Sequence, residues 1–504
     1  MNKTFENTTH AISYVDEKSE ALKQEILNAP DTHRMAYRTF YISSNGSDVN
    51  DGTTPETAWA TIERLNEAEL NWGDVVYFER GGFWRGEVVC RQGVTYAAYG
   101  VGEKPKIYGS PEDGADPSKW TLVNKEKNIW KYHREFPDVG LIVFNHGELH
   151  SSKALPDYID GKYYVRNDNL MDFKAEFCLE NQLDKDLMLF SDCSKVVNAK
   201  NIIRINDKKN IGPLYLRCDK GNPGEVFDSI EFCTRPNIFS MCNNSGITID
   251  NFCLKYCGGH AIGGYNSMNI TVTNCEIGWI GGSIQLYLDN GKAVRYGNGI
   301  EIAANCYNYI ADHNWVYQIY DAGISYQARE GITQCLDYLV RFTNNLLEYC
   351  IYGIEYFLGA CKDTNIRNYQ KDIEFSNNII RYSGFGFGEQ RPDKKTSAAM
   401  KTWPTHANDS EDFIVKNNVF DRSRYCLINL MAFNSDWIPK YENNLIIQTA
   451  NTDAYLGWYK TEDVTVRLDF EGMEEPETKK YIDRLGADIY YSEKDWLYDI
   501  PEEN

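Results

Sequence analysis

A short unit containing asparagine recurs along the second half of this chain. Each unit is a polar residue, an asparagine and two mostly apolar residues, and the units lie at Asp250-Asn251, Thr273-Asn274, His313-Asn314, Asn344-Asn345, Asn377-Asn378, Asn417-Asn418 and Asn443-Asn444. The shorter intervals between successive units have the length of one coil of three short strands. The longer intervals indicate that loops are inserted at a preferred turn. Asparagines that stack at a turn suit a parallel β-helix, because their amides form hydrogen-bonded ladders and they tolerate left-handed backbone.

We therefore predict an all-β fold, a right-handed parallel β-helix whose main part spans residues 236–455. A β-propeller or a leucine-rich repeat would show a steadier period and its own signature residues. An asparagine-rich β-sandwich remains as the alternative.

The segments around the main solenoid have patterns of their own. Residues 1–35 carry an apolar helical stripe that ends before Pro30, which predicts a helix packed as a cap over the open end of the solenoid. Short β runs between glycine-rich turns predict the first coils over 36–111, with a brief helix at Ile62–Leu70. Strand-like tryptophans and longer polar loops predict a β-sandwich inserted over 112–235. Residues 456–504 are expected to form a C-terminal extension.

Charge and cysteine content limit the partners and the compartment. The net charge of −21 argues against a nucleic-acid partner, because such a chain repels phosphate backbones. An apolar leader at the N-terminus and a membrane-length apolar run are both absent from the sequence, so no membrane partner is expected. The 14 cysteines lack paired spacing, which predicts free thiols and a cytoplasmic protein. We predict no metal and no other cofactor, and a homo-oligomer stays open.

Several stretches resemble a known superfamily. The runs YISSNGSDVNDGT, GDVVYFERGGFWRGE and GVTYAAYGVGEKPKIYGS are similar to the N-terminal region of bacterial β-helix proteins of the pectate-lyase-like superfamily. The runs GNGIEI, DAGIS and NNLLEYCIYGIEYF are similar to coils of β-helical glycoside hydrolases, some of which also insert a β-sandwich. The resemblance covers most of the chain and implies the fold. It implies the activity only weakly, because the superfamily includes lyases, hydrolases, epimerases and non-catalytic tailspikes.

The chain departs from the catalytic motifs of this superfamily. It has no DPHD motif of alginate epimerases and no paired-aspartate run of polygalacturonases. The Asn-His-Gly-Pro stretch of β-helical xylosidases is also missing. Therefore, the known catalytic pairs of these families cannot be transferred to this chain.

Candidate catalytic residues instead come from stacking the coils. Aligning the coils on their Gly-Ile pairs predicts one inward stack of Ile300, Ile324, Ile354, Phe387 and Leu427. The outward column beside it then contains Glu301, Ser325, Glu355, Gly388 and Asn429. A second outward column contains Gln318, Glu348, Arg381 and Asp421.

Three carboxylates stand out in this alignment as catalytic candidates. Glu301 and Glu355 are two rungs apart, or roughly 9 to 10 Å between Cα atoms. This spacing suits an inverting glycosidase, whose carboxyl groups lie about 6.5–9.5 Å apart. Asp321, at the turn before Ser325, would form a closer pair with either glutamate, as in a retaining enzyme. Each of the three could instead be a solvated side chain, and Asp321 could bond only to its own turn.

Other residues are expected to bind substrate. They comprise the outward His260, Trp279 in an inserted loop, Tyr326 next to Ser325, Glu348 of the second column, and Arg391, Trp403 and His406 of the longest loop. Long loops on a rigid scaffold commonly carry such residues. A salt bridge with Arg381 is the structural alternative for Glu348, and packing within the loop is the alternative for Trp403 and His406.

The expected function is that of a glycoside hydrolase, exo-acting on an oligosaccharide substrate, with two carboxylates on the outer face of the helix. A polysaccharide lyase acting on uronate-containing glycans is the first alternative, since Arg381, Arg391 and Lys401 could serve its chemistry. A non-catalytic carbohydrate-binding solenoid is the second, but it would leave Glu301 and Glu355 without a role.

Overall fold

The protein is represented by a computed structural model of the whole chain. The structure describes residues 5–32, 34–136, 138–153, 158–159, 162–163, 187–191, 203–204, 212–287, 293–328, 336–359, 368–391, 394–402, 409–449 and 453–492.

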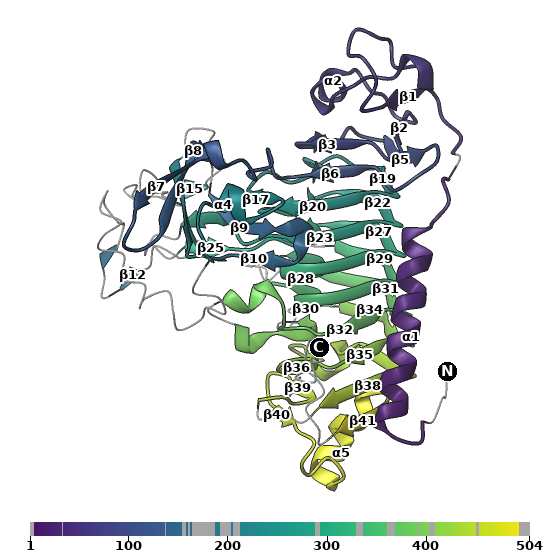
Figure 1. The fold of residues 1–504 in the computed structure, drawn as a ribbon. Coiled ribbons are helices and arrows are strands. Elements are labelled where there is room, and N and C mark those ends of the chain that lie inside the picture. The colour runs from purple at the N-terminus through teal and green to yellow at the C-terminus, as the bar shows by residue number, and fades with distance from the viewer. Residues whose placement is uncertain are drawn as a thin grey trace.

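Parallel strands stacked in coils form the body of the molecule (Figure 1). The first face is a ten-stranded parallel sheet in the order β1-β2-β5-β19-β22-β27-β29-β31-β34-β37. Its strands are β1 (Thr39–Ile42), β2 (Val75–Glu79), β5 (Thr95–Tyr99), β19 (Ile247–Asp250), β22 (Met268–Thr273), β27 (Cys306–Asp312), β29 (Leu336–Thr343), β31 (Tyr369–Ser376), β34 (Asp409–Lys416) and β37 (Lys440–Glu442). Because β5 pairs directly with β19, the coils before the insertion continue into those after it.

Two further faces complete each coil. The second face contains β3 (Phe83–Arg85), β6 (Lys106–Tyr108), β20 (Cys253–Cys257), β23 (Glu276–Ile280), the first halves of β28 (Trp315–Ala328) and β30 (Leu346–Leu358), β32 (Ile379–Arg381), β35 (Val419–Asp421), β38 (Asn444–Thr449) and β41 (Ala487–Ser492). The third face contains β4 (Val88–Val89), β18 (Phe239–Ser240), β21 (Ile262–Tyr265), β26 (Ile300–Ala303), the second halves of β28 and β30, β33 (Ala398–Thr402), β36 (Cys426–Met431) and β39 (Gly457–Lys460). The fold is the predicted right-handed parallel β-helix.

A ladder of buried asparagines holds the turn between the first and second faces. Asn314, Asn345, Asn378 and Asn418 each donate a backbone and a side-chain hydrogen bond to the amide oxygen of the next asparagine, at 2.9–3.2 Å. The series ends at Asn444. The residue before each ladder asparagine has left-handed backbone, as at Asn377 with φ 57°. This confirms the predicted ladder.

The first two asparagine units are out of register with that ladder. Asn251 (φ 73°) and Asn274 (φ 54°) themselves occupy the left-handed position. The position that holds an asparagine in the later coils is filled there by the buried Phe252 and Cys275. The ladder therefore starts at Asn314.

Helix α1 (Thr8–Leu27) lies along the side of the solenoid (Figure 1). Its buried side chains pack on a row of apolar residues from successive coils of the second face, namely Leu346, Ile379, Val419 and Ile447. Asp16 of α1 also forms ion pairs with Arg381 and Arg422. A helix in this segment was predicted correctly, but its expected place over the open end is wrong. The reason is that its apolar stripe matches the outer row of the second face.

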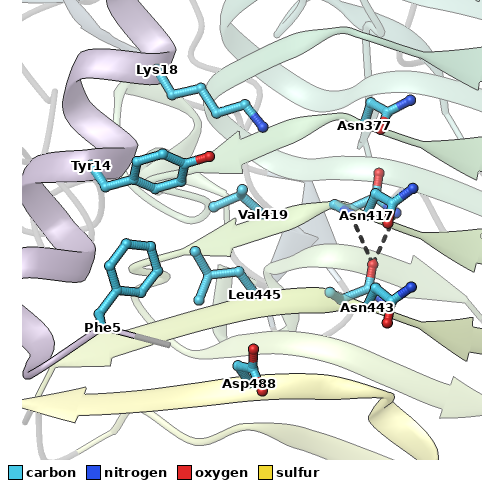
Figure 2. Close-up of a pocket in the computed structure, with 11 residues that line it drawn as sticks. Phe5, Tyr14, Lys18, Asn377, Asn417, Val419, Asn443, Leu445 and Asp488 are labelled. Carbon is cyan, nitrogen blue, oxygen red and sulfur yellow. Dashed lines mark hydrogen bonds between the residues drawn. The ribbon is translucent and has the colours of Figure 1, made fainter. Parts of the chain in front are cut away.

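A small cavity of about 130 Å³ remains beside α1 (Figure 2). Phe5, Tyr14 and Lys18 lie on its helix side, and Asn377, Asn417 and Asn443 face it from the asparagine turn. The cavity marks the line along which α1 meets the solenoid.

Between β6 and β18 the chain leaves the solenoid and forms a second layered unit. An antiparallel sheet of β7 (Trp120–Asn124), β8 (Ile129–Phe136) and β16 (Gly212–Cys218) extends to β14 (Leu187–Ser191) and β11 (Ser152–Lys153). It packs on β9 (Val139–Phe144) and β17 (Ile230–Thr234) through an aromatic core that includes Trp120, Tyr132, Phe136, Phe144 and Phe232. Figure 1 shows this unit projecting on the side opposite α1. It is the predicted inserted β-sandwich.

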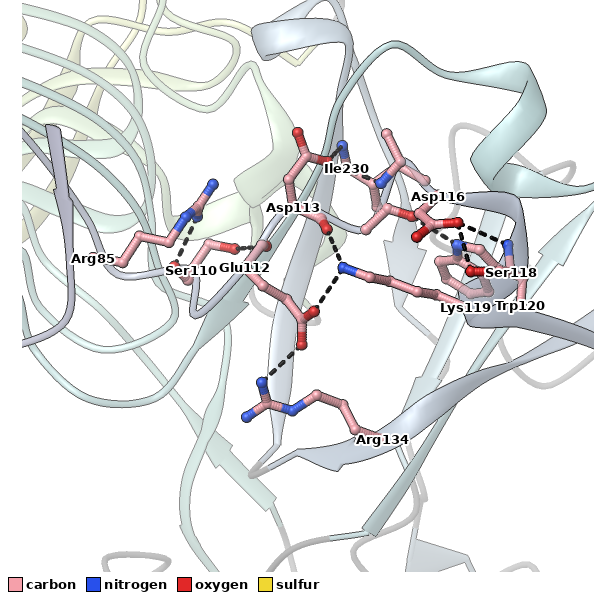
Figure 3. A network of polar contacts seen from close by, with 12 residues as sticks. Arg85, Ser110, Glu112, Asp113, Asp116, Ser118, Lys119, Trp120, Arg134 and Ile230 are labelled. Carbon is pink, nitrogen blue, oxygen red and sulfur yellow. Dashed lines mark hydrogen bonds and ion pairs between the residues drawn. The ribbon is translucent and has the colours of Figure 1, made fainter.

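Polar contacts at the start of the insertion, several of them drawn in Figure 3, hold it on the first coils. Arg85 on β3 pairs with Glu231 on β17 at 2.7 Å and donates to the carbonyl oxygen of Ser110 at 2.8 Å. The Glu112 carboxylate forms ion pairs with both Lys119, at 2.8 Å, and Arg134, at 2.7 Å. These contacts hold the start of the insertion in a defined position on the solenoid.

Smaller elements complete the described chain. The predicted brief helix is α2 (Ile62–Glu67), and the segment after β39 forms β40 (Thr465–Leu468), α5 (Pro476–Ile482) and β41. Within the described ranges, no helix is long and apolar enough to cross a membrane.

Candidate active site

The outward column of the third face carries the candidate site. Backbone pairing places Glu301 opposite Ser325, Ser325 opposite Glu355, and Glu355 opposite Lys401. The side chains alternate between inside and outside, so these four residues point away from the core stack of Ile300, Ile324, Ile354 and Met400. The sequence alignment predicted the first three members of this column.

The fourth member of the column was predicted wrongly. Gly388 does not follow Glu355, because the coil makes an excursion after β32 that contains the short helices η6 (Phe387–Gln390) and η7 (Lys394–Thr396). The chain rejoins the third face only at β33, which brings Lys401 into the column and Met400 into the core. Phe387 packs instead in an outer aromatic cluster, and Ile428 rather than Leu427 pairs with Met400.

Glu355 is held by two donors. Lys401 Nζ lies 2.7 Å from Glu355 Oε1, and Gln327 Nε2 donates to Oε2 at 3.0 Å. The Lys401 ammonium also lies 3.6 Å from the centre of the Tyr352 ring. Burial opposes the charge of Lys401, but Glu355, Tyr352 and Asp321 outweigh it, so the pKa of Lys401 is raised above its usual value.

Asp321 lies beside this pair, at the bend where β28 passes from the second face to the third. Arg391 Nη1 from the η6–η7 excursion lies 2.6 Å from its Oδ1. Burial is the largest influence and raises the pKa of Asp321 to about 7, with Arg391 opposing and Glu355 and Glu301 adding to the rise. Asp321 is therefore a carboxyl group that can hold a proton near neutral pH.

Glu301 is the third carboxylate of the cluster. The side-chain amide of Asn298 donates to Glu301 Oε2 and, at 3.0 Å, to the hydroxyl of Ser325. His260 Nδ1 lies 3.2 Å from Glu301 Oε2 and also accepts from the backbone N–H of Asn298 at 3.1 Å. The structure thus brings His260 and Arg391 together with the three predicted carboxylates.

Two predicted binding residues lie elsewhere. Tyr326 is fully buried inside the coil among Phe342, Tyr356 and Phe375, because it falls one residue after the outward Ser325. It cannot contact a substrate on the outer face. Trp279, 6% exposed, packs with Phe387 between the insertion and the solenoid, in a cluster that also contains Tyr320 beneath Arg391.

Glu348 occupies the second face and is separated from the carboxylate cluster. Its Oε2 accepts from the indole N–H of Trp315 at 2.9 Å, and burial raises its pKa. The alternative of a salt bridge with Arg381 is not seen either, because Arg381 pairs with Asp421 at 3.1 Å and with Asp16. Tyr317, and not Gln318, is the residue that pairs with Glu348 in this column.

Trp403 and His406 lie outside the described residues. Of the predicted loop residues, Arg391 and Trp279 are therefore the ones whose surroundings are known.

The sequence did not predict three polar residues around the carboxylates, namely Asn298, Gln327 and Tyr352. Gln327 is two residues beyond Ser325 on the same strand, so extending the strand alternation would have found it. Asn298 stands two residues before Ile300, at the position of Ala322 and Tyr352 in the next coils. Aligning this position across the three coils would have identified Asn298 and Tyr352 as polar residues of one column.

The described residues of the cluster are not arranged to hold a metal ion. Among the described residues, no group of three histidine, cysteine, aspartate or glutamate side chains is placed to hold one. The chemistry available on this face is that of paired carboxyl groups with cations and amides around them.

Comparisons with models of protein families and with curated proteins found no match. Among solved structures, a complex of XylC with xylose is 12% identical, over 90% of this chain and 82% of that one, with a TM-score of 0.38. A lacto-N-biosidase from Eubacterium ramulus is 12% identical, over 83% and 67% of the two chains, with a TM-score of 0.33. An exopolygalacturonase from Thermotoga maritima is 10% identical, over 90% and 98%, with a TM-score of 0.30. At these values the likeness concerns the fold alone.

Proposed function

We propose that the protein is a glycoside hydrolase that uses Asp321 as the general acid and Glu355 as the second carboxylate. The observation that carries this proposal is the raised pKa of Asp321, about 7, beside two further carboxylates on the outer face of the solenoid. Glycosidases need one protonated and one ionised carboxyl group on either side of the bond that they cleave. Environments that separate two neighbouring carboxyl groups in this way identify the acid and its partner.

The roles follow from the contacts of each group. Protonated Asp321 would donate its proton to the oxygen of the leaving group. Glu355, ion-paired with Lys401, would attack the anomeric carbon or activate a water for that attack. We assign the second role to Glu355 rather than Glu301 because Glu355 has the larger electrostatic effect on Asp321. Glu301, with His260 and Asn298, would hold hydroxyl groups of the bound sugar.

The lyase alternative is weakened by the state of the cations. A lysine that abstracts a proton must first lose its own, yet the pKa of Lys401 is raised by Glu355. Arg391 is likewise engaged with Asp321 at 2.6 Å. A non-catalytic solenoid would have no use for a buried carboxyl group that keeps its proton near neutral pH.

We further propose exo-action on oligosaccharides and a cytoplasmic location. The excursion that carries Arg391 folds onto the outward column, and such a wall favours a site that receives the end of a chain. Ten cysteines in the described part of the chain are free, and nine of them are buried, which supports a reducing compartment.

The test is hydrolysis of a panel of aryl glycosides and end-labelled oligosaccharides by the wild type, Asp321→Asn and Glu355→Gln. Glu355→Gln should lose several powers of ten in kcat on every substrate, and Asp321→Asn should lose as much on the oligosaccharides but still cleave aryl glycosides with good leaving groups. Azide should restore turnover to Glu355→Gln, and the anomer of the product would distinguish a nucleophile from a base. Release of single terminal units supports exo-action. Glu348→Gln is the matched control, since Glu348 lies on the same strand but on the second face. Unsaturated products absorbing in the ultraviolet, or full activity of both variants, would refute the proposal.

A further inference from the structure

A second hollow lies on the second face of the solenoid, where α1 ends. Below this point α1 covers the outward residues from Trp315 to Leu445. Above it, the outward residues Lys106, Cys253 and Glu276 of successive coils line the hollow, with Cys253 buried at its floor. In the next outward column, Gly278 lies between Lys255 and Tyr317, and the Tyr317 ring packs over it. The resulting cavity has a volume of about 760 Å³.

Three lysines line this cavity, and two of them already have acidic partners. Lys106 Nζ lies 2.6 Å from Glu103, and Lys255 Nζ lies 2.6 Å from Glu276. Lys104 is different. It is only 4% exposed and donates to the amide oxygen of Asn251, and among the described carboxylates Asp250 and Glu276 act on it as nearby charges without forming an ion pair with it.

The cavity therefore carries one surplus positive charge in a chain whose net charge is −21. Burial lowers the pKa of Lys104 to about 8, as expected for an ammonium group that lacks a counter-ion. A buried charge without a counter-charge is costly, and a bound anion would reduce that cost.

The other lining residues narrow the class of anion. The half-buried ring of Tyr108 lies at one side of the cavity, 4.7 Å from the ring of the buried Tyr256 behind it, and His146 of the insertion lies nearby. Such rings pack on the apolar face of a sugar, while Glu276 and the lysines can bond to its hydroxyl groups. Inorganic phosphate has no apolar face for the Tyr108 ring to contact, and the cavity has no arginine among its described lining residues to bind phosphate in a bidentate way.

We propose that this cavity binds a hydroxylated monocarboxylate, a sugar acid, with its carboxylate at Lys104. This site is separate from the carboxylate cluster, which lies on the third face, so it goes beyond the proposed hydrolase activity. The ligand's ring would lie against Tyr108.

Calorimetric titration of the full chain at pH 7 with glucuronate, glucose and inorganic phosphate tests the proposal. Glucuronate should bind at least tenfold more tightly than either glucose or phosphate. Lys104→Met should weaken glucuronate binding at least tenfold. Lys106→Met, at the exposed rim, should weaken it by a smaller factor and serves if Lys104→Met does not fold. Lys371→Met, which removes a lysine from the first face, is the matched control and should bind like the wild type.

Three outcomes would overturn the proposal. Glucuronate could fail to bind, phosphate could bind as tightly as glucuronate, or glucuronate binding could be unchanged in both Lys104→Met and Lys106→Met. The last result would place the anion elsewhere, as at Arg391 and Lys401. None of these results depends on whether the protein hydrolyses glycosides, so the two proposals can fail independently.

Discussion

Lys401 Nζ lies 2.7 Å from Glu355 Oε1, and the two residues are paired directly across neighbouring strands of the third face. Both side chains are nearly buried, at 8% and 5% exposed. A surface ion pair contributes little, but removing one partner of a buried pair leaves an uncompensated charge. The contact therefore affects both the stability of the column and the charge state of the proposed site.

We expect Lys401→Met to lower kcat by at least about a hundredfold and to destabilise the protein by about 3–5 kcal/mol. Lys401→Arg should keep the positive charge and therefore lose less activity and less stability than Lys401→Met. Steady-state kinetics and urea unfolding would measure the two effects. Wild-type kcat in Lys401→Met would show that the ion pair has no role in the reaction.

The pH dependence of the reaction should report on Asp321. A general acid works only while it is protonated, and the pKa of Asp321 is raised to about 7. kcat/KM should therefore be retained below that pH and fall as the pH rises through about 7. Because Arg391 opposes the rise, Arg391→Met should move this limb to higher pH, provided that residual activity allows its measurement. A limb that stays in place in Arg391→Met would assign it to another group.

The fold could be predicted from the sequence because its strongest constraint is local. Each turn of the asparagine ladder needs a left-handed residue followed by a buried amide, and both preferences are visible in single units. The place of α1 could not be predicted in this way. The apolar row that it covers is assembled from Leu346, Ile379 and Val419, which come from three different coils.

The candidate site could be predicted where coils follow one another without long loops. Glu301, Ser325 and Glu355 lie on consecutive rungs, and the alignment found them. Lys401 was not predicted in this column because the η6–η7 excursion adds residues to its coil. An alignment that counts from one Gly-Ile pair to the next therefore stops at the wrong residue. Tyr326 shows how strict the alternation is, since a shift of one residue moves a side chain from the outer face into the core.

Asn298 should act as a positioning residue. Its side chain donates to Glu301 and Ser325, and its amide oxygen accepts from the backbone N–H of Ala322, next to Asp321. We expect Asn298→Ala to lower kcat by about ten- to a hundredfold, because Glu301 and the turn at Asp321 would both lose their hydrogen bonds to this side chain. Asn298→Asp adds a negative charge near Asp321, so the alkaline limb should move to higher pH.

The control for this residue is Asn244→Ala. The Asn244 side chain also bonds to a backbone group, the carbonyl oxygen of Cys90 at 2.9 Å, but in the first coils. It should lose some stability and keep the wild-type pH profile. A pH profile that is identical in Asn298→Asp and the wild type would leave Asn298 with a purely structural role.

The asparagine ladder should be a major source of solenoid stability. Asn378 is fully buried, accepts two hydrogen bonds from Asn345, and donates to Asn418 at 2.9 Å and to the carbonyl oxygen of Phe342 at 2.8 Å. Asn378→Ala leaves these buried groups unsatisfied, each at a cost of about 1–3 kcal/mol. We expect a total loss of about 2–4 kcal/mol by urea unfolding, because partial rearrangement of the ladder would recover some of the bonds.

Asn377→Gly is the matched control for the ladder, one residue earlier in the chain. Asn377 is exposed and has left-handed backbone, which glycine adopts without strain. This variant should stay within about 0.5 kcal/mol of the wild type. Equal losses in the two variants would mean that the turn itself, rather than the buried amide, stabilises the coil. A loss confined to Asn378→Ala would assign the effect to the hydrogen-bonded ladder, because the two positions share the same turn and differ in burial and bonding.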